Sequence, residues 1–266
     1  YVGGTTGLIY GFVNDGFYTV DDFKPFDSKS RTWTLKDGVV NSSPLSGDPR
    51  PGNAKFKKLT PVDENSANPY TLTDDDRTVI GNTTPKFSGG FGLNATFKGF
   101  DVSAFFNFMY DFDVFNANKV MMTTWASNNY NNFSMDISAA KRWRYFDDMG
   151  NEIRYSPEIL AEFNKNATMW NPTSIGRPIA MSYAVEDGSF LRLNTATIGY
   201  TLPRAWTNKV GLSRVRFYAS GYNLFTITGY SGYDPEVDIA TGLTPNIDNN
   251  RYPRSRTYTF GVQLTF

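Results

Sequence analysis

Apolar and polar residues alternate without a single error at the end of the chain, over residues 257–266. Threonine, glycine or glutamine occupies every second position of this run. Because successive side chains of a β-strand point to opposite faces of a sheet, the period of two predicts a strand with one polar and one apolar face. The apolar face holds five residues in succession: Tyr258, Phe260, Val262, Leu264 and Phe266.

The same alternation appears in four earlier stretches, 87–97, 100–112, 189–202 and 213–225. Lys98 and Gly99 separate the first two, and a two-residue connection containing glycine is typical of a β-hairpin. In the third stretch the two halves are out of phase, and we expect a β-bulge near Asn194, where one extra residue reverses the facing. Phe105 and Met109 are exceptions, since they interrupt the polar side of their run.

Alternation by itself fits a soluble β-sandwich as well as a membrane barrel. Length separates the two, because the runs hold about 11 to 14 residues, whereas soluble strands have about 5 or 6 and transmembrane strands need about 9 to 11. Connections also alternate in size, from two residues through about 76 and about 10 to about 27. Short periplasmic turns and long extracellular loops are typical of outer-membrane barrels, and aromatic residues such as Tyr110 and Tyr200 near the run ends match their interfacial girdles. The sequence therefore favours a transmembrane barrel.

The alternation of short and long connections predicts which segments lie in the membrane and which lie outside the cell. We expect 1–86 to be an extracellular loop region with short strands, 87–112 a transmembrane β-hairpin and 113–188 a long extracellular loop. Residues 189–266 then form three transmembrane strands with one extracellular loop. The only helix we expect is a short one within 153–167, and 203–211 is expected to be a simple connection.

Composition narrows the function. The chain has no histidine and no cysteine, which excludes a histidine-based triad, a cysteine nucleophile, a disulfide and the usual zinc and iron–sulfur sites. Basic and acidic residues balance at 26 each, so no basic field points to nucleic acid. Aromatic residues make up 16% of a chain whose mean hydropathy is −0.41, a combination that a lipid-facing and a lumen-facing surface would explain. The start, YVGGTTGLIY, lacks a basic segment followed by an apolar one, so we expect the chain to begin partway through a protein or after a removed signal.

Several segments, spread over the whole chain and in the same order, resemble the C-terminal part of SusC/RagA-type TonB-dependent outer-membrane transporters. They are GLIYGFVNDGFYTVDDF (7–23), DDDRTVIGNTTPKFSGGFGLNATFKGFDVSAFF (74–106), VEDGSFLRLNTATIGYTLP (185–203), VRFYASGYNLFTITGYSGYDPEV (215–237) and YPRSRTYTFGVQLTF (252–266).

The resemblance implies an all-β segment of a large antiparallel barrel of about 22 strands, plugged by an N-terminal domain. It also implies a SusD/RagB-like surface lipoprotein as a lid, energy from the TonB complex, and import of an oligosaccharide or oligopeptide across the bacterial outer membrane without a cofactor. Five predicted strands cannot close such a barrel, so the remaining barrel and the plug belong to chain absent here. The alternatives are an outer-membrane barrel with a structural or adhesive role, or one with an enzymatic role.

Aromatic residues of the predicted external loops are candidate ligand contacts, because rings can stack on sugars or contact peptides; they could equally pack the loops together or meet the lid protein. These residues are Trp125, Trp143, Tyr145, Trp170, Tyr230 and Tyr233. Charged residues on the predicted polar face could contact the plug or simply be solvated in the lumen: Asp101, Arg192, Arg214 and Arg216.

Two further features follow from the resemblance. The terminal alternating strand, ending in the aromatic residue Phe266, resembles the signal that the outer-membrane assembly machinery recognises. Relatives often carry an aspartate-rich, calcium-like loop before the DRTVIGN segment, and here Asp74, Asp75 and Asp76 stand at that place without the glycines of a tight calcium loop. We therefore expect no metal site, and an acidic solvated turn instead.

Overall fold

The computed structural model describes residues 4–125, 132–237 and 245–266. Within it the chain divides into two compact units. The first unit comprises Tyr1–Gly7, Asn82–Val114 and Glu186–Phe266, and the second comprises Leu8–Gly81 and Phe115–Val185. No helix in the described residues is long and apolar enough to cross a membrane.

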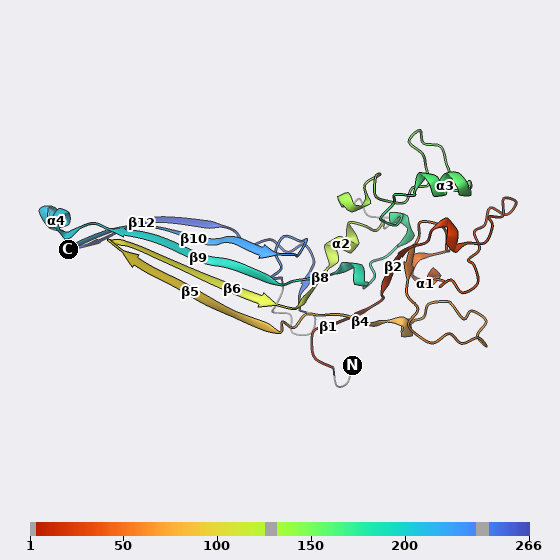
Figure 1. Cartoon of the computed structure of the whole chain (residues 1–266), viewed down its shortest axis with the longest axis horizontal. Coiled ribbons are helices and arrows are strands. Elements are labelled where there is room, and N and C mark those ends of the chain that lie inside the picture. Colours follow the sequence, from red (N-terminus) through yellow and green to blue (C-terminus); the bar gives the residue numbers. More distant parts are fainter. Residues whose placement is uncertain (1–3, 126–131, 238–244) are drawn as a thin grey trace. The chain divides into compact units, whose positions relative to one another are not determined.

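The first unit is built on one antiparallel sheet of five strands, in the order β12-β10-β9-β6-β5. Figure 1 shows these strands side by side, with β5 and β12 at the two edges. Each of the five alternating runs forms one strand, which confirms the strand prediction. The strands are β5 (Phe87–Phe97), β6 (Phe100–Tyr110), β9 (Phe190–Thr201), β10 (Arg214–Thr228) and β12 (Thr257–Thr265).

The hairpin between β5 and β6 turns at Lys98 and Gly99, whose φ angles are both positive, 46° and 88°. Two central residues with positive φ define a type I′ turn, whose twist matches that of the strands it joins. A Cβ atom on Gly99 would lie 2.8 Å from the carbonyl oxygen of Thr201, so glycine is required there for space as well as for conformation. The predicted two-residue turn is confirmed.

β9 carries one more residue than β6 in the middle of the sheet. Phe105 pairs with Thr195 and the next residue, Phe106, pairs with Leu193, which leaves Asn194 as the extra residue. An extra residue reverses the facing of everything beyond it, so the leucines of β9 join the apolar side of the sheet. The predicted bulge near Asn194 is confirmed.

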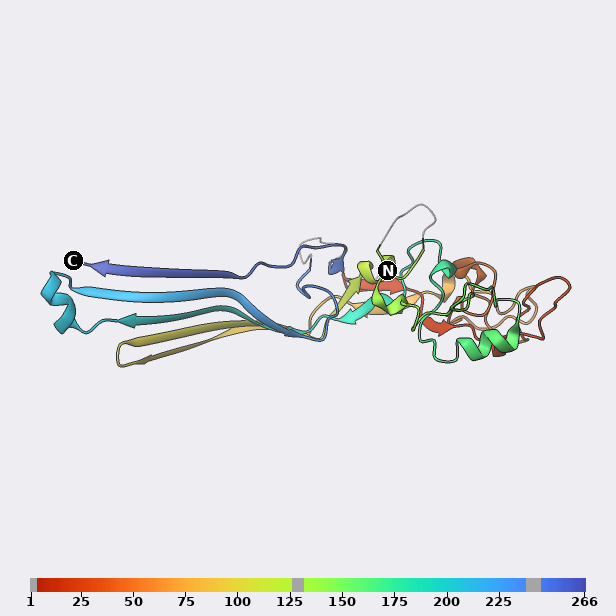
Figure 2. The same ribbon diagram turned by 90° about the horizontal axis from the view of Figure 1, so that it is seen from above.

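β10 is irregular at the same level, between Tyr222 and Phe225, and Asn223 has a φ of 52° there. Bulges bend the strands that carry them, and β10 is visibly bent along its length in Figure 2. Within the described residues, β5 pairs only with β6 and β12 only with β10. Both edges therefore expose unpaired backbone groups, to which another strand could pair.

The second unit consists of short strands and helices around two clusters of buried apolar side chains. It contains β1 (Leu8–Gly11), β2 (Asn14–Phe17), α1 (Ser43–Ser46), β3 (Ala54–Phe56), α2 (Ala117–Met121) and α3 (Pro157–Phe163), and β4 (Thr78–Asn82) ends at its boundary. Residues 8–81 and 115–185, which the sequence predicts as loops, thus form a compact unit with its own cores.

The remaining elements are short. They are β7 (Asp113–Asn116), β8 (Val185–Asp187), β11 (Ile247–Asp248), α4 (Arg204–Thr207) and the single-turn 3-10 helices η1 (Val20–Asp22), η2 (Asp74–Asp76), η3 (Met135–Ile137), η4 (Pro172–Ser174), η5 (Ser182–Ala184) and η6 (Asn208–Val210). α3 confirms the helix predicted within 153–167. The expectation of a single helix was wrong, because α1, α2 and α4 each span only four or five residues and leave no amphipathic period to detect.

Candidate functional site

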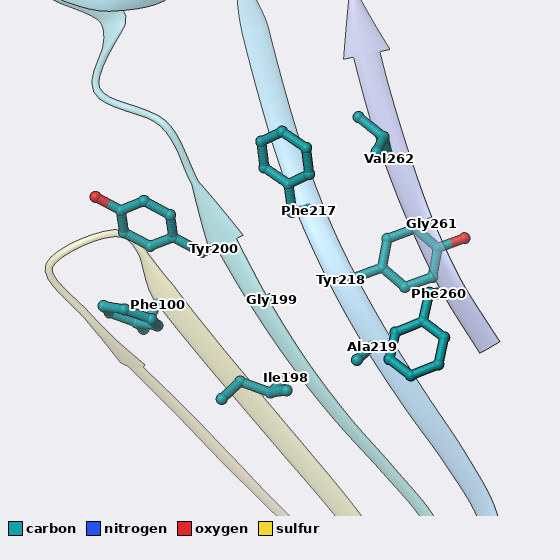
Figure 3. Close-up of a pocket in the computed structure, with 10 residues that line it drawn as sticks. All are labelled: Phe100, Ile198, Gly199, Tyr200, Phe217, Tyr218, Ala219, Phe260, Gly261 and Val262. Atoms are coloured by element: carbon teal, nitrogen blue, oxygen red, sulfur yellow. The ribbon is translucent and has the colours of Figure 1, made fainter. Parts of the chain in front are cut away.

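The apolar face of the five-stranded sheet is exposed. Phe260 is 79% exposed and Phe97 71% exposed. Figure 3 shows a shallow pocket on this sheet, of about 480 Å³, where the ring of Phe100 lies beside that of Tyr200 with centroids 4.5 Å apart. A continuous exposed apolar face of this kind marks a surface that contacts a membrane or another protein.

The polar face carries an ion pair between Asp101 in β6 and Arg216 in β10. The guanidinium binds both carboxylate oxygens, with Arg216 Nε 2.9 Å from Asp101 Oδ1. The pair crosses β9 beside Gly199, which is the register partner of Asp101, whereas Arg216 pairs with Thr201 two residues further along β9. A Cβ atom on Gly199 would lie 2.4 Å from Arg216 Nη2, so the glycine leaves room for the bridge. Arg214 is exposed, two residues before Arg216, at the start of β10.

Arg192 also lies on the polar face but is only 1% exposed. Its guanidinium donates to Asp234, and its Nη1 lies 3.7 Å from Glu236 Oε2. Glu236 in turn pairs with Arg254 at 2.6 Å. A buried guanidinium needs compensating charge, and the two carboxylates supply it. The sequence analysis identified Arg192 but missed its two partners, Asp234 and Glu236, because residues 42 or more positions away along the chain share no local pattern with it.

The two acidic residues belong to residues 230–237, which we call the strap. Tyr230 and Val237 of the strap pack in a buried cluster with Phe112, Val114 and Phe190, and Met109 lies against the same cluster. The Tyr230 hydroxyl donates to Asp248 at 2.6 Å. Burial, followed by this hydrogen bond to the carboxylate, raises the pKa of Tyr230 well above its ordinary value.

The six candidate ligand-contacting rings fall into two groups. Trp143, Tyr145, Trp170 and Tyr230 are each at most 6% exposed and pack inside the clusters of their units. Trp125 and Tyr233 are 48% and 82% exposed. In this structure the four buried rings pack the loops, and only the two exposed rings present a face to a ligand.

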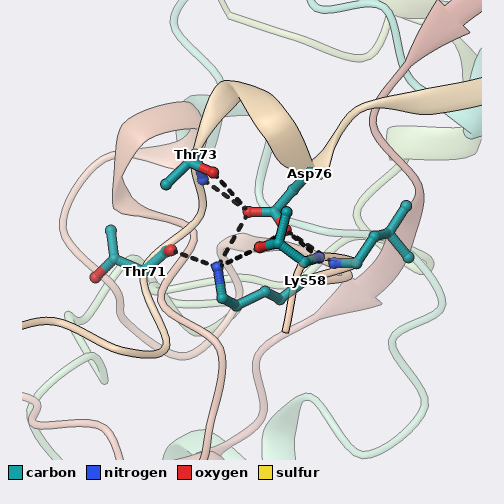
Figure 4. Close-up of polar contacts among 6 residues, drawn as sticks. Lys58, Thr71, Thr73 and Asp76 are labelled. Carbon is teal, nitrogen blue, oxygen red and sulfur yellow. Dashed lines mark hydrogen bonds and ion pairs between the residues drawn. The ribbon is translucent and has the colours of Figure 1, made fainter. Parts of the chain in front are cut away.

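Figure 4 shows how Asp76 ties two segments of the second unit together. Its Oδ1 accepts hydrogen bonds from the backbone of Leu59 and Thr60 at 2.9 and 2.8 Å, and its Oδ2 accepts one from the backbone of Thr73 at 2.8 Å. Lys58 Nζ lies 3.4 Å from the same carboxylate. Burial acts to raise the pKa of Asp76, but the hydrogen bonds outweigh it and hold the pKa well below its ordinary value.

The three neighbouring aspartates do not converge on one point. Asp76 is fully buried, whereas Asp74 is exposed and pairs with Arg77 at 2.7 Å. Asp75 is exposed. No group of three or more metal-ligating side chains comes together in residues 4–125, 132–237 and 245–266. Asp74 and Asp75 are solvated as we expected, whereas the buried anchor at Asp76 differs from the expected solvated turn.

A small pocket of about 180 Å³ lies in the second unit. Its lining includes Arg77, Arg177 and Phe12, and the Arg77 guanidinium stands 5.0 Å above the Phe12 ring. Arg77 also forms an ion pair with Asp74, so this carboxylate offsets part of the positive charge of the pocket.

The terminal strand exposes its apolar side as the sequence predicts, and Phe266 is 89% exposed. Its role as an assembly signal stays a prediction, as do the plug contacts of Asp101, Arg192, Arg214 and Arg216.

No family model matches this sequence. The chain is 30% identical over 270 residues to the TonB-dependent receptor P3 of Formosa agariphila, an alignment that covers 99% of this chain and 22% of that relative. It is 32% identical over 164 residues to the TonB-dependent receptor SusC of Bacteroides thetaiotaomicron, covering 56% of this chain and 15% of the relative. The chain thus spans about a fifth of the length of such relatives.

Solved structures with a similar fold include a chain of the RagAB peptide transporter, with a TM-score of 0.62 and 21% identity, covering 99% of this chain and 23% of that one. The RagAB peptide importer in its closed-closed state gives a TM-score of 0.58 and 22% identity, covering 97% of this chain and 23% of that one. These similarities confirm the predicted fold class, an all-β segment of a large transmembrane β-barrel.

Proposed function

We infer that this chain, which belongs to the SusC/RagA-type TonB-dependent receptors, forms part of the wall and the outer region of a transporter in the bacterial outer membrane. The transporter imports an oligomeric nutrient, an oligosaccharide or an oligopeptide, and carries out no covalent chemistry on it. The remaining barrel strands and the plug belong to the same full-length protein.

The observation that carries the proposal is the two-faced sheet. One face presents exposed rings such as Phe260 and Phe97, which suit a hydrocarbon environment. The other face carries charged residues, Asp101 with Arg216 and Arg192 with Asp234, which suit a polar lumen and would be costly against lipid. A sheet with these two faces separates lipid from a polar passage, which is what a transporter wall must do.

The orientation follows from the connections. The tight turn at Lys98 and Gly99 faces the periplasm, together with the short segment that contains α4. The long connections between the strands then face the cell exterior, where they contact substrate and a SusD/RagB-like surface lipoprotein. Energy comes from the TonB complex in the inner membrane, acting on the plug.

Import is tested with the full-length protein expressed in a strain that lacks other transporters of this class. Two fluorescently labelled probes are offered separately, a tryptic digest of casein and a partial hydrolysate of starch. We expect uptake of one probe that disappears on deletion of TonB or on addition of a protonophore. Uptake that persists without TonB, or no uptake of either probe above the level of cells lacking the transporter, contradicts the proposed function.

A further inference from the structure

The strap lies on the polar face of the sheet, over its end remote from the Lys98–Gly99 turn. Phe190 of β9 and Met109 of β6 are register partners on this face, and both lie in or against the cluster that buries Tyr230 and Val237 of the strap. At this end, the face that is polar along most of the sheet carries the apolar side chains of Phe190 and Met109, and the strap covers them. This contact fixes the two ends of the strap against the inner surface of the wall.

Polar contacts fix the residues between these ends. Ser231 donates to the Glu186 carboxylate through its backbone NH at 2.9 Å and its hydroxyl at 2.8 Å. Asp234 accepts from Arg192 and from the backbone NH of Glu236 at 2.9 Å. Because Arg192 is 1% exposed, the ionic contact is largely shielded from water and holds its geometry better than a surface pair would.

Tyr233 is the exception among these anchored residues. Its neighbours Ser231 and Asp234 are held by hydrogen bonds, but its own side chain is 82% exposed. Gly232 allows the tight path just before it, since a Cβ atom there would lie 2.3 Å from the Tyr230 ring. The strap thus holds the backbone of Tyr233 on the polar face of the sheet and leaves its ring free.

We propose that Tyr233 is a substrate-contacting residue of the lumen wall and that Arg192, acting through Asp234, is the residue that positions it. The proposal rests on the transport function inferred above. The ligand chemistry is a flat apolar face carried by the imported oligomer, supplied by a sugar ring or by a peptide side chain. Tyrosine suits this role because its ring offers a large contact area and loses little conformational entropy on binding.

The experiment uses the full-length transporter in cells and the two labelled probes, and it records the substrate concentration at half-maximal uptake. Tyr233→Ala should raise this concentration by about 2- to 10-fold, the loss expected for one aromatic contact. Tyr233→Phe should match the wild type, since the ring face makes the contact. The matched control is Tyr252→Ala, which removes a ring that is 91% exposed in the same connection between β10 and β12. It should leave uptake unchanged.

Positioning is tested by Asp234→Asn, which keeps the shape of the side chain and removes its charge. If Arg192 and Asp234 act by placing Tyr233, Asp234→Asn raises the half-maximal concentration, and the double variant with Tyr233→Ala is no worse than Tyr233→Ala alone. The amount of folded, heat-modifiable protein in the outer membrane is measured for each variant, so that lost transporter is not mistaken for weaker binding. The probe that shows the effect identifies a sugar ring or a peptide side chain as the source.

Three failures can be told apart. If the wild type imports a probe with TonB and Tyr233→Ala behaves like Tyr252→Ala, the role of Tyr233 is overturned while the transport function stands. If Asp234→Asn and Tyr233→Ala have independent, additive effects, Arg192 and Asp234 do not position Tyr233. If the wild type imports neither probe, the transport function and the inference built on it both fail.

Discussion

Replacing Val262 by arginine tests whether the apolar face of β12 contacts hydrocarbon. Val262 is 54% exposed and lies midway between the aromatic residues Tyr258 and Phe266. Four residues at about 3.3 Å each, on a strand tilted by about 40°, place it about 10 Å in depth from either ring. An arginine at this position therefore starts close to the middle of the apolar band.

An arginine on the lipid face near the midplane of a barrel costs about 2 to 4 kcal/mol. This lowers the ratio of folded to unfolded protein by about 30- to 700-fold. Thr259→Arg is the matched control, because Thr259 lies three residues away on the polar face, in register with Ser220. There we expect a change within about 0.5 kcal/mol, as for a solvated surface position.

The assay is urea unfolding of the full-length protein in phospholipid vesicles, with the folded fraction read from its heat-modifiable mobility. Val262→Arg should lower the unfolding midpoint strongly and Thr259→Arg hardly at all. Equal losses for the two variants, or a larger loss for Thr259→Arg, would refute the assignment of lipid and lumen faces.

Two further predictions concern charged groups. Asp76→Asn should destabilise the second unit by about 2–3 kcal/mol, because it weakens hydrogen bonds to a buried carboxylate; limited proteolysis of the full-length protein measures this. Since the pKa of Asp76 is held low in the folded state, its stabilisation is fully present above the ordinary aspartate pKa of about 3.9 and is lost as the pH falls from there through the lower folded pKa. Acidification below about pH 4 should thus weaken the wild type more than Asp76→Asn, and an equal response of the two argues against the anchor. A double-mutant cycle of Asp101→Ala and Arg216→Ala, measured by urea unfolding in vesicles, should give a coupling free energy of about 1 kcal/mol. Gly199→Val should remove most of this coupling. A coupling of zero would mean that the bridge does not form in the membrane.

The strands of the sheet were predictable because apolar and polar residues alternate with a period of two, and this pattern is visible within each strand by itself. The bulge was predictable for the same reason, since the phase of the alternation changes at Asn194. Phe105 and Met109, the two apolar exceptions on the polar face of their run, could be explained only from their neighbours in the structure. Phe105 covers Gly90, where a Cβ atom would lie 2.8 Å from its ring, and Met109 packs beneath the strap.

The second unit and most of the site depend on contacts between distant residues, which leave no periodic signal. A Cβ atom on Gly52 would lie 2.2 Å from the indole of Trp143, so this ring is buried by a segment that is remote in the sequence. Four of the six candidate rings are buried for reasons of this kind. The partners of Arg192 escaped detection likewise, since the sequence left Arg192 as either a plug contact or a solvated residue of the lumen.

The most direct measurement is a cysteine scan along β12 of the full-length transporter, since this chain has no cysteine of its own and any elsewhere in the protein can be replaced first. Single cysteines at 257, 258, 259, 260, 262, 263, 264 and 265 are exposed in outer membranes to a water-soluble maleimide and, separately, to a membrane-soluble one. We predict that labelling by the soluble reagent alternates, with 257, 259, 263 and 265 reacting and 258, 260, 262 and 264 protected but open to the membrane-soluble reagent. Uniform labelling by the soluble reagent, or the opposite alternation, would contradict a transporter wall with one face in lipid and the other toward a polar lumen.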